Sequence, residues 1–154
     1  MIPTGPALEF ACTLKVDLGA VRTLGDGRFG QRRIIPIIGG TVEGPGLRGT
    51  ILNLGADWQT VQADGAAHLD TRYAFETHDG ALIEIVNTGT RHGPPDAIAA
   101  LARGDDVDPV RYYMRTVARL ETGDARYGWV NNTLFVGTGR RRAQAVEVDL
   151  FAVR

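Results

Sequence analysis

The chain has 154 residues, and its charges nearly cancel, with 17 basic and 18 acidic side chains and a formal net charge of −1. This length is enough for one domain that buries about two-thirds of its unfolded surface, so neither a metal nor a disulfide is needed for stability. A nearly neutral chain has no broad basic face. We therefore expect neither a nucleic acid nor a membrane as a partner.

The cellular setting follows from a few further features. The single cysteine, Cys12, excludes an internal disulfide and lies in a strand-like run that favours a buried thiol. No stretch reaches the ~20 apolar residues of a membrane-spanning helix, and Met1–Gly5 lacks the basic and apolar regions of a signal peptide. Arginine supplies nearly all the basic charge, which is typical of a GC-rich bacterial genome. We expect a soluble, cytoplasmic bacterial protein.

The first part of the chain has the composition of strands separated by glycine-rich turns. Leu8–Asp17 predicts a strand, and Gly25–Gly27 predicts a flexible connection. The run Arg33–Val42 is β-branched but contains Pro36, which favours an edge strand, an irregular strand or a bulge, and the pair Gly39–Gly40 favours a bend.

The most distinctive stretch comes next. Leu47–Leu54 predicts a strand that leads to Gly55–Gln59, where an acid and a large aromatic residue stand side by side. We interpret Gly55–Gln59 as a segment at the rim of the fold. The pair Asp64–Gly65 then indicates a hairpin turn.

The clearest hairpin runs from Ala67–Thr77 through the turn His78–Gly80 to Ala81–Thr88. Successive side chains of a strand point to opposite faces. On this basis Tyr73 belongs to the core face of the first strand. Asn87 continues an apolar face of the second strand, so it is the expected buried polar group.

One short helix is predicted near residues 95–103, where prolines and Asp96 precede the apolar run and Gly104 follows it. Strands are then expected at Tyr112–Glu121, Thr133–Val136 and Ala145–Val153, with the segment 137–142 turning the chain before the last of them. About 8–10 strands with one short helix predict an all-β fold, a single closed antiparallel β-barrel domain spanning residues 1–154.

Several short motifs occur in a characteristic order along nearly the whole chain: Val42-Glu43-Gly44-Pro45, Gly49, Gly55-Ala56-Asp57-Trp58-Gln59, Asp64-Gly65, Arg72-Tyr73, His78-Asp79-Gly80-Ala81, Asn87-Thr88-Gly89 and Tyr127-Gly128-Trp129-Val130-Asn131-Asn132. In these motifs the chain resembles domain-of-unknown-function family 3237. The resemblance implies a soluble, often homo-oligomeric β-barrel domain without a cofactor. It implies no particular reaction, because the family has no established general function.

Asp57 and Trp58 are the first candidates for chemistry. A carboxylate kept in a partly apolar mouth would have a raised pKa and could transfer protons. The alternative is a structural turn, in which Asp57 bonds to its own backbone and Trp58 only packs.

A second group of candidates could orient an aromatic or carbonyl-bearing ligand in an apolar cavity. Tyr73 would donate a hydrogen bond. Arg115 would bind a carboxylate if its strand face points inward, and would be solvated if that face points outward. The remaining ligand-binding candidates are Asn87, Trp129, Asn131 and Asn132.

Other classes of site are disfavoured. His68, His78 and His92 are too dispersed to predict a metal site. The motifs of serine hydrolases, P-loop proteins and dinucleotide-binding enzymes are missing from the sequence. Three consecutive arginines at 140–142 in a neutral chain are typical of a solvated turn.

These features predict a small-molecule-binding barrel that acts as a cofactor-independent lyase or isomerase by general acid and base catalysis. Decarboxylation, isomerisation or cyclisation of an aromatic or polyketide-like carbonyl or carboxylate compound would fit. Asp57 would move the proton, with Tyr73 and Arg115 as the other catalytic residues and Trp58 and Trp129 as the walls around the ring. The alternative is a non-catalytic carrier or sensor that uses the same cavity.

Overall fold

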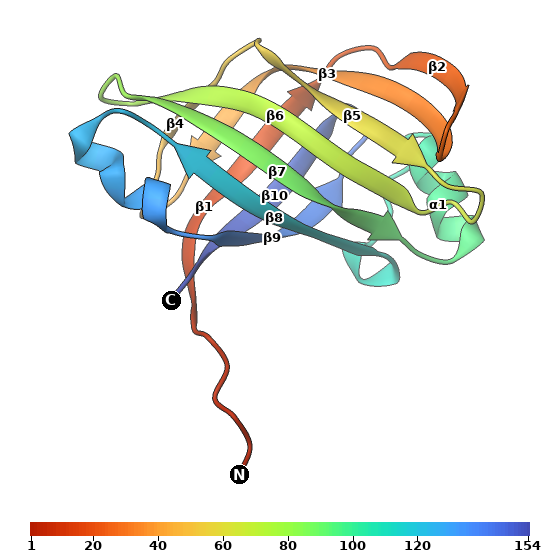
Figure 1. Cartoon of the computed structure of the whole chain (residues 1–154). Helices are drawn as coiled ribbons and strands as arrows, with labels where there is room; N and C mark the ends of the chain where they lie inside the picture. Colours follow the sequence, from red (N-terminus) through yellow and green to blue (C-terminus); the bar gives the residue numbers. More distant parts are fainter.

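The computed structural model describes residues 1–154, and all ten of its strands belong to one antiparallel sheet (Figure 1). The strands are β1 (Leu8–Leu18), β2 (Arg22–Gly27), β3 (Gly30–Glu43), β4 (Gly49–Ile51), β5 (Gly55–Val61), β6 (Ala67–Thr77), β7 (Leu82–His92), β8 (Tyr113–Glu121), β9 (Phe135–Arg141) and β10 (Ala145–Val153). The helical elements are α1 (Pro95–Ala102) and the 3-10 segments η1 (Pro109–Arg111) and η2 (Ala125–Asn132).

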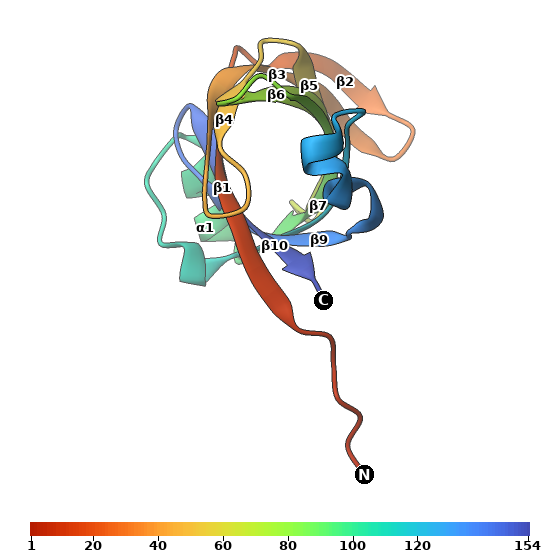
Figure 2. The ribbon, with the colours of Figure 1, turned by 90° about the vertical axis from the view of Figure 1, so that its left-hand side faces the viewer.

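The sheet closes into a barrel because β1 pairs with β10 on one side and with β3 on the other. The view along the axis in Figure 2 shows the ring. Around it the order is β1, β10, β9, β8, β7 and β6, then β4 and β5 together, then β3. The two short strands β4 and β5 share one place between β3 and β6, so the closed barrel has eight strands. The predicted all-β barrel with a short helix is confirmed.

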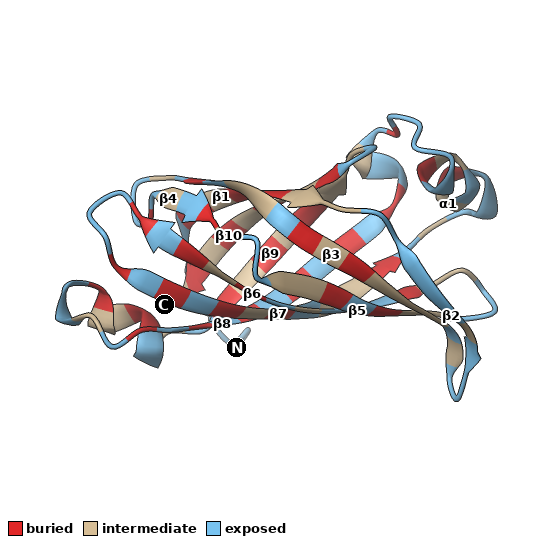
Figure 3. Ribbon diagram, turned by 90° about the horizontal axis from the view of Figure 1, so that it is seen from above, coloured by how far each residue is buried: buried red, intermediate tan, exposed pale blue.

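Strand alternation decides what lies inside the barrel. In β8 the residues alternate strictly between buried and exposed, with Met114, Thr116 and Ala118 inside. Figure 3 shows the same banding along the other strands. Because the sheet is closed, one face of every strand forms the interior and the other face contacts solvent or the helical segments.

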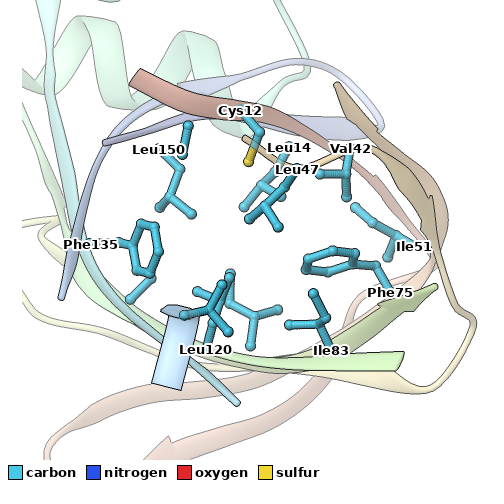
Figure 4. Close-up of a cluster of buried hydrophobic side chains, with 14 of the residues drawn as sticks. Cys12, Leu14, Val42, Leu47, Ile51, Phe75, Ile83, Leu120, Phe135 and Leu150 are labelled. Carbon is cyan, nitrogen blue, oxygen red and sulfur yellow. The ribbon is translucent and has the colours of Figure 1, made fainter. Parts of the chain in front are cut away.

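The interior divides into two halves along the barrel axis. The half near η2 is filled by a cluster of 21 buried apolar residues, among them Phe75, Phe135 and Leu14 (Figure 4). At the other end α1 and η1 lie beside the barrel (Figure 1), and a smaller cluster including Leu101 and Met114 packs α1 against the strands. The region between the two clusters contains the polar side chains of the interior.

Strand β3 runs for 14 residues through Pro36, which lies opposite Ala56 of β5. The bend predicted at Gly39–Gly40 coincides with a register shift in the pairing of β1 with β3. Gly40 has φ 134°, and a Cβ atom on it would lie 1.9 Å from the carbonyl oxygen of Lys15. Only glycine lets β1 and β3 approach so closely at this point.

Several predicted boundaries of strands and turns differ from the structure. Leu47–Leu54 is not one strand, because only Gly49–Ile51 pairs with its neighbours. Gly55–Gln59 is not a rim segment but belongs to β5, with partners on both sides. Residues 137–141, predicted as a turn, continue β9, and the chain turns at 142–144 instead.

The predicted helix is confirmed as α1, and the hairpin turns at Asp64–Gly65 and His78–Gly80 are confirmed between β5, β6 and β7. Gly25–Gly27, predicted as a flexible connection, instead belongs to β2, which forms a hairpin with β3. None of the helical segments has the length and apolar character needed to cross a membrane.

Candidate functional site

A cavity occupies the half of the barrel that the large apolar cluster leaves unfilled. The space open to the centre of a water molecule measures about 50 Å³. Nine of its 16 lining residues are hydrophobic, with Tyr73 among them, and the other seven are Asp57, Gln59, Thr71, Asn87, Arg91, Thr116 and Arg141. A mostly apolar concavity with a few convergent polar groups is the usual form of a small-molecule site.

Asp57 reaches this cavity because it lies within a strand. In β5 it stands opposite Thr71 of β6, which in turn stands opposite Asn87 of β7, so the three residues form one row across the barrel wall. The alternation that turns Asp57 inward turns Trp58 outward. Asp57 therefore lines the cavity and does not bond to its own backbone in a turn, and the residue is only 7% exposed.

Both carboxylate oxygens of Asp57 accept hydrogen bonds. The backbone N–H of Asp70 donates to Oδ1 at 2.9 Å, and the side-chain amide of Gln59 donates to Oδ2 at 2.8 Å. The Gln59 carbonyl oxygen in turn accepts a hydrogen bond from Nε of Arg33 at 2.7 Å. This series of hydrogen bonds holds the Asp57 carboxylate in one orientation and links it to the Arg33 guanidinium without a direct ion pair.

Burial raises the pKa of Asp57 above its ordinary value, and this effect exceeds the opposing ones. The hydrogen bonds from Asp70 and Gln59 and the charges of Arg91 and Arg33 all act to lower the pKa. A carboxyl group with a raised pKa is a stronger base when ionised and can also return a proton.

Four buried side-chain atoms in the protein have no hydrogen-bond partner: the hydroxyl of Tyr73, Oδ1 of Asn87, Nε of Arg91 and Oγ1 of Thr116. All four residues line this one cavity. An unpaired buried polar group costs about 1–3 kcal/mol, so such groups are normally paired. All four unpaired atoms therefore belong to residues around a single space, where a polar ligand could pair with them.

Tyr73 lies where the cavity meets the large apolar cluster and is 3% exposed. Burial raises the pKa of its phenol far above the ordinary value, with a smaller contribution from Cys12. The hydroxyl therefore keeps its proton at neutral pH. It can donate a hydrogen bond to a ligand oxygen.

Two arginines, Arg91 and Arg141, line the cavity, and the charge of a third, Arg33, acts on both of them. Arg91 is 7% exposed, and burial, together with the charges of Arg33 and Arg141, lowers its pKa to about 10. Arg91 thus remains cationic at neutral pH. Arg141 lines the cavity, and its Nη1 donates to the carbonyl oxygens of Arg142 at 2.7 Å and Ala145 at 3.1 Å.

Two predicted site residues lie on the outer surface. Arg115 has the outward of its two possible orientations: it is exposed, it donates a hydrogen bond to the carbonyl oxygen of Met114 at 3.0 Å, and its guanidinium lies 5.3 Å from the ring centre of Tyr113. Trp58 is 46% exposed on the outer face of β5. Neither residue lines the cavity.

The predicted residues of η2 lie at the opposite end of the barrel. Trp129 packs against Phe135, with ring centres 5.9 Å apart, and the two groups of the Asn131 side-chain amide bond to the backbone of Thr122 at 2.9 Å. Asn132 is exposed. The structure therefore brings Asp57, Tyr73 and Asn87 together and places the other five predicted residues elsewhere.

Four further polar residues line the cavity and were not predicted from the sequence: Gln59, Arg91, Arg141 and Thr116. A signal for Arg91 was present, because it lies four residues after Asn87 on the same strand face, but β7 was predicted to end at Thr88. Gln59 likewise shares the face of Asp57 two residues away. Arg141 was hidden by the predicted turn at 137–142.

Solved structures of similar proteins share this barrel. A Rhodopseudomonas palustris protein, described as a conserved protein of unknown function, matches with a TM-score of 0.95 at 40% identity, covering 99% of this chain and 100% of that one. A curated protein from that organism, named a UPF0311 protein, is 42% identical over 150 residues, which are 96% of this chain and 98% of that protein. A "beta-barrel like protein" of Acinetobacter baumannii matches with a TM-score of 0.87 at 46% identity, covering 99% of each chain.

A more distant relative has a named activity. It is a protein of Penicillium herquei named a hydroalkoxylation enzyme, 26% identical over 136 residues, which are 88% of this chain and 76% of that protein. A solved structure described as an enzyme from Penicillium herquei shares the fold with a TM-score of 0.75 at 20% identity, covering 100% of this chain and 98% of that one. The family model described as "Protein of unknown function (DUF3237)" matches residues 6–153, and the chain therefore belongs to this family.

Proposed function

We propose that the protein is a cofactor-independent enzyme of the lyase or isomerase type, which works by general acid and base catalysis inside the barrel. The observation that carries the proposal is the cavity lined by one oriented, buried carboxylate and by every unpartnered buried polar side-chain atom of the chain. Asp57 is the proton-transferring group. Tyr73 donates a hydrogen bond to an oxygen on which negative charge develops.

The reaction class that agrees best with these two groups is cyclisation, in which a hydroxyl group adds across a carbon–carbon double bond conjugated to a carbonyl. Asp57 takes the hydroxyl proton, the oxygen bonds to the β-carbon, and the resulting enolate oxygen is stabilised by Tyr73. The enolate carbon then takes the proton back from Asp57. No atom or electron is gained or lost, so no cofactor is required.

Support for this class comes from the Penicillium herquei relative, because hydroalkoxylation is the addition of an O–H bond across a carbon–carbon double bond. Nine of the 16 lining residues are apolar, and a mostly apolar surrounding strengthens electrostatic interactions with developing charge. Decarboxylation would use the same groups, with Asp57 as the proton donor.

The test is turnover of a panel of hydroxylated aromatic enones, followed by mass spectrometry and chromatography. Asp57→Asn should lower turnover by about 100- to 10,000-fold while the barrel stays folded, because a general base contributes roughly this much. Asp70→Asn is the matched control, since the Asp70 side chain lies on the outer face of β6. Undiminished turnover by folded Asp57→Asn refutes the role of Asp57. Tight retention of compounds that are never converted would identify a carrier instead.

A further inference from the structure

The arginines of the cavity differ from those on the outer surface. Outside, Arg140 pairs with Glu147 at 3.2 Å and with Asp149, and Arg126 pairs with Asp124 at 2.7 Å. Arg91 takes part in none of the ion pairs of the chain, although it is more buried than Arg140 and Arg126. A buried cation without a paired anion is strongly disfavoured in a folded protein.

Asp57 is the only carboxylate of the protein whose charge acts on Arg91, and it forms no ion pair with it. Asp57 is the one carboxylate that lines the cavity, and both of its oxygens already accept hydrogen bonds. Arg33 and Arg141 are close enough for their charges to act on Arg91 and add to the positive potential. Three guanidinium groups and one carboxylate leave this region with an excess of positive charge that a bound anion would balance.

The three arginines are not equally available to a ligand. Arg33 is held by the carbonyl oxygen of Gln59, and Arg141 is held by two backbone carbonyl oxygens. Arg91 has a buried Nε without any partner. The edge of a guanidinium formed by Nε and one terminal nitrogen matches the two oxygens of a carboxylate.

We propose that the substrate of this site carries a carboxylate group, which Arg91 binds through Nε in the outer part of the cavity, while the opposite end of the substrate carries a hydroxyl or carbonyl oxygen. That the ligand is a substrate rests on the proposed function, whereas the binding site itself is inferred from the cavity alone. We favour a carboxylate over a phosphate because Arg91 has the one unpartnered guanidinium nitrogen of the three arginines, and a single guanidinium edge matches the two oxygens of a carboxylate.

The deep end of the cavity defines the other end of the ligand. Asn87 and Arg91 are four residues apart on β7, so their Cα atoms lie roughly 13 Å apart at the usual rise of a strand. The unpartnered atoms of Asn87, Tyr73 and Thr116 can bond to a ligand hydroxyl or carbonyl. With the apolar walls between, the expected ligand is an aromatic or enone acid of one or two rings with an oxygen distal to the carboxylate.

Carboxylate binding would also act on Asp57. The charges of Arg91 and Arg33 lower the pKa of Asp57 in the free protein. A bound anion offsets those charges, so Asp57 becomes a stronger base once the substrate is in place. Binding and proton transfer are thereby linked through the same arginine.

The test measures binding by calorimetry and melting temperature with benzoate, 4-hydroxybenzoate and 2-naphthoate, each beside its neutral amide, and with inorganic phosphate. At least one acid should bind about tenfold or more tightly than its amide, since a hydrogen bond to a charged group contributes roughly 1.5–3 kcal/mol. Arg91→Met should abolish this preference. Arg115→Met, the same change on the outer face of neighbouring β8, should preserve it.

Three outcomes overturn the proposal: equal or weaker binding of every acid relative to its amide, survival of the preference in Arg91→Met, or tighter binding of phosphate than of every acid. If Arg91→Met does not fold, Arg91→Lys keeps the charge but loses the planar fork, and it should retain a reduced preference. Asp57→Asn separates this inference from the proposed function. It should still prefer acids over amides, whether or not the wild-type protein converts any of them.

Discussion

The two halves of the barrel interior are built from the same strands and differ in what fills them. Near η2, side chains such as Phe75 and Phe135 are completely buried and pack against each other's neighbours in one apolar cluster. In the other half, the same strands contribute Asp57, Asn87 and Arg91 to a cavity. The filled half supplies stability. This stability lets the protein as a whole tolerate unpaired polar groups in the half that contains the cavity.

The largest effect on stability is expected in the filled half. Phe75→Ala should lower the free energy of unfolding by about 3–5 kcal/mol, because it removes a fully buried ring and leaves a cavity. Urea denaturation followed by fluorescence measures the change. Leu69→Ala, in the lining of the cavity, should lower it less, and an equal loss in both variants would contradict the division into two halves.

The filled half should also be closed to reagents. Burial raises the pKa of the Cys12 thiol to about 12, with a smaller effect from Asp149. At pH 8 the thiolate fraction is then lower by roughly three orders of magnitude than for a free cysteine with a pKa near 8.5. Labelling with iodoacetamide should be slow by a similar factor until denaturant is added, and rapid labelling of the native protein would show that this half is open.

At the boundary between the two halves, a substitution is expected to raise the free energy of unfolding by a smaller amount. Tyr73→Phe removes a buried hydroxyl that has no partner, so it should raise the unfolding free energy of the ligand-free protein by about 1 kcal/mol. The same change should weaken ligand binding. A loss of stability in the absence of ligand would mean that the Tyr73 hydroxyl is paired in solution.

The smallest effect is a pH dependence from Asp57. Its pKa is raised in the folded protein, so the folded state binds the proton more tightly than the unfolded state. Wild-type stability is therefore fully retained below the unfolded pKa near 3.9 and is partly lost as the pH rises through the folded pKa. Relative to Asp57→Asn, the wild type should gain stability as the pH falls from 7 to 4 in urea titrations. An unchanged difference across this range would show that the pKa is not raised.

The barrel could be predicted well from the sequence, because turn residues and the alternation of apolar and polar residues in a strand are local features of the chain. Hairpin turns such as His78–Gly80 and the alternation of Ala67–Thr77 depend on neighbouring residues alone, and both were correct. Tyr73 and Asn87 were placed correctly by the same alternation.

The rest of the site depends on pairing between distant strands. Arg91 on β7 and Arg115 on β8 both lie in strands whose side chains alternate between the two faces. Only the register of β7 with β8 and the closure of the sheet place Arg91 inside and Arg115 outside. The aromatic and amide residues of η2 looked like a binding motif but lie at the other end of the barrel. Sequence spacing alone does not determine which end a segment reaches.

The shared place of β4 and β5 in the wall has a consequence for how the protein can change. Residues 52–54 separate β4, which lies beside the filled half, from β5, which carries Asp57; both strands pair with β6. A Cβ atom on Gly55 would lie 2.3 Å from the carbonyl oxygen of Arg72, so glycine fixes where the second piece begins. Insertions in this short, exposed connection can be absorbed without shifting either register. Variation there could reshape the pocket wall over evolution while the filled half of the barrel stays intact.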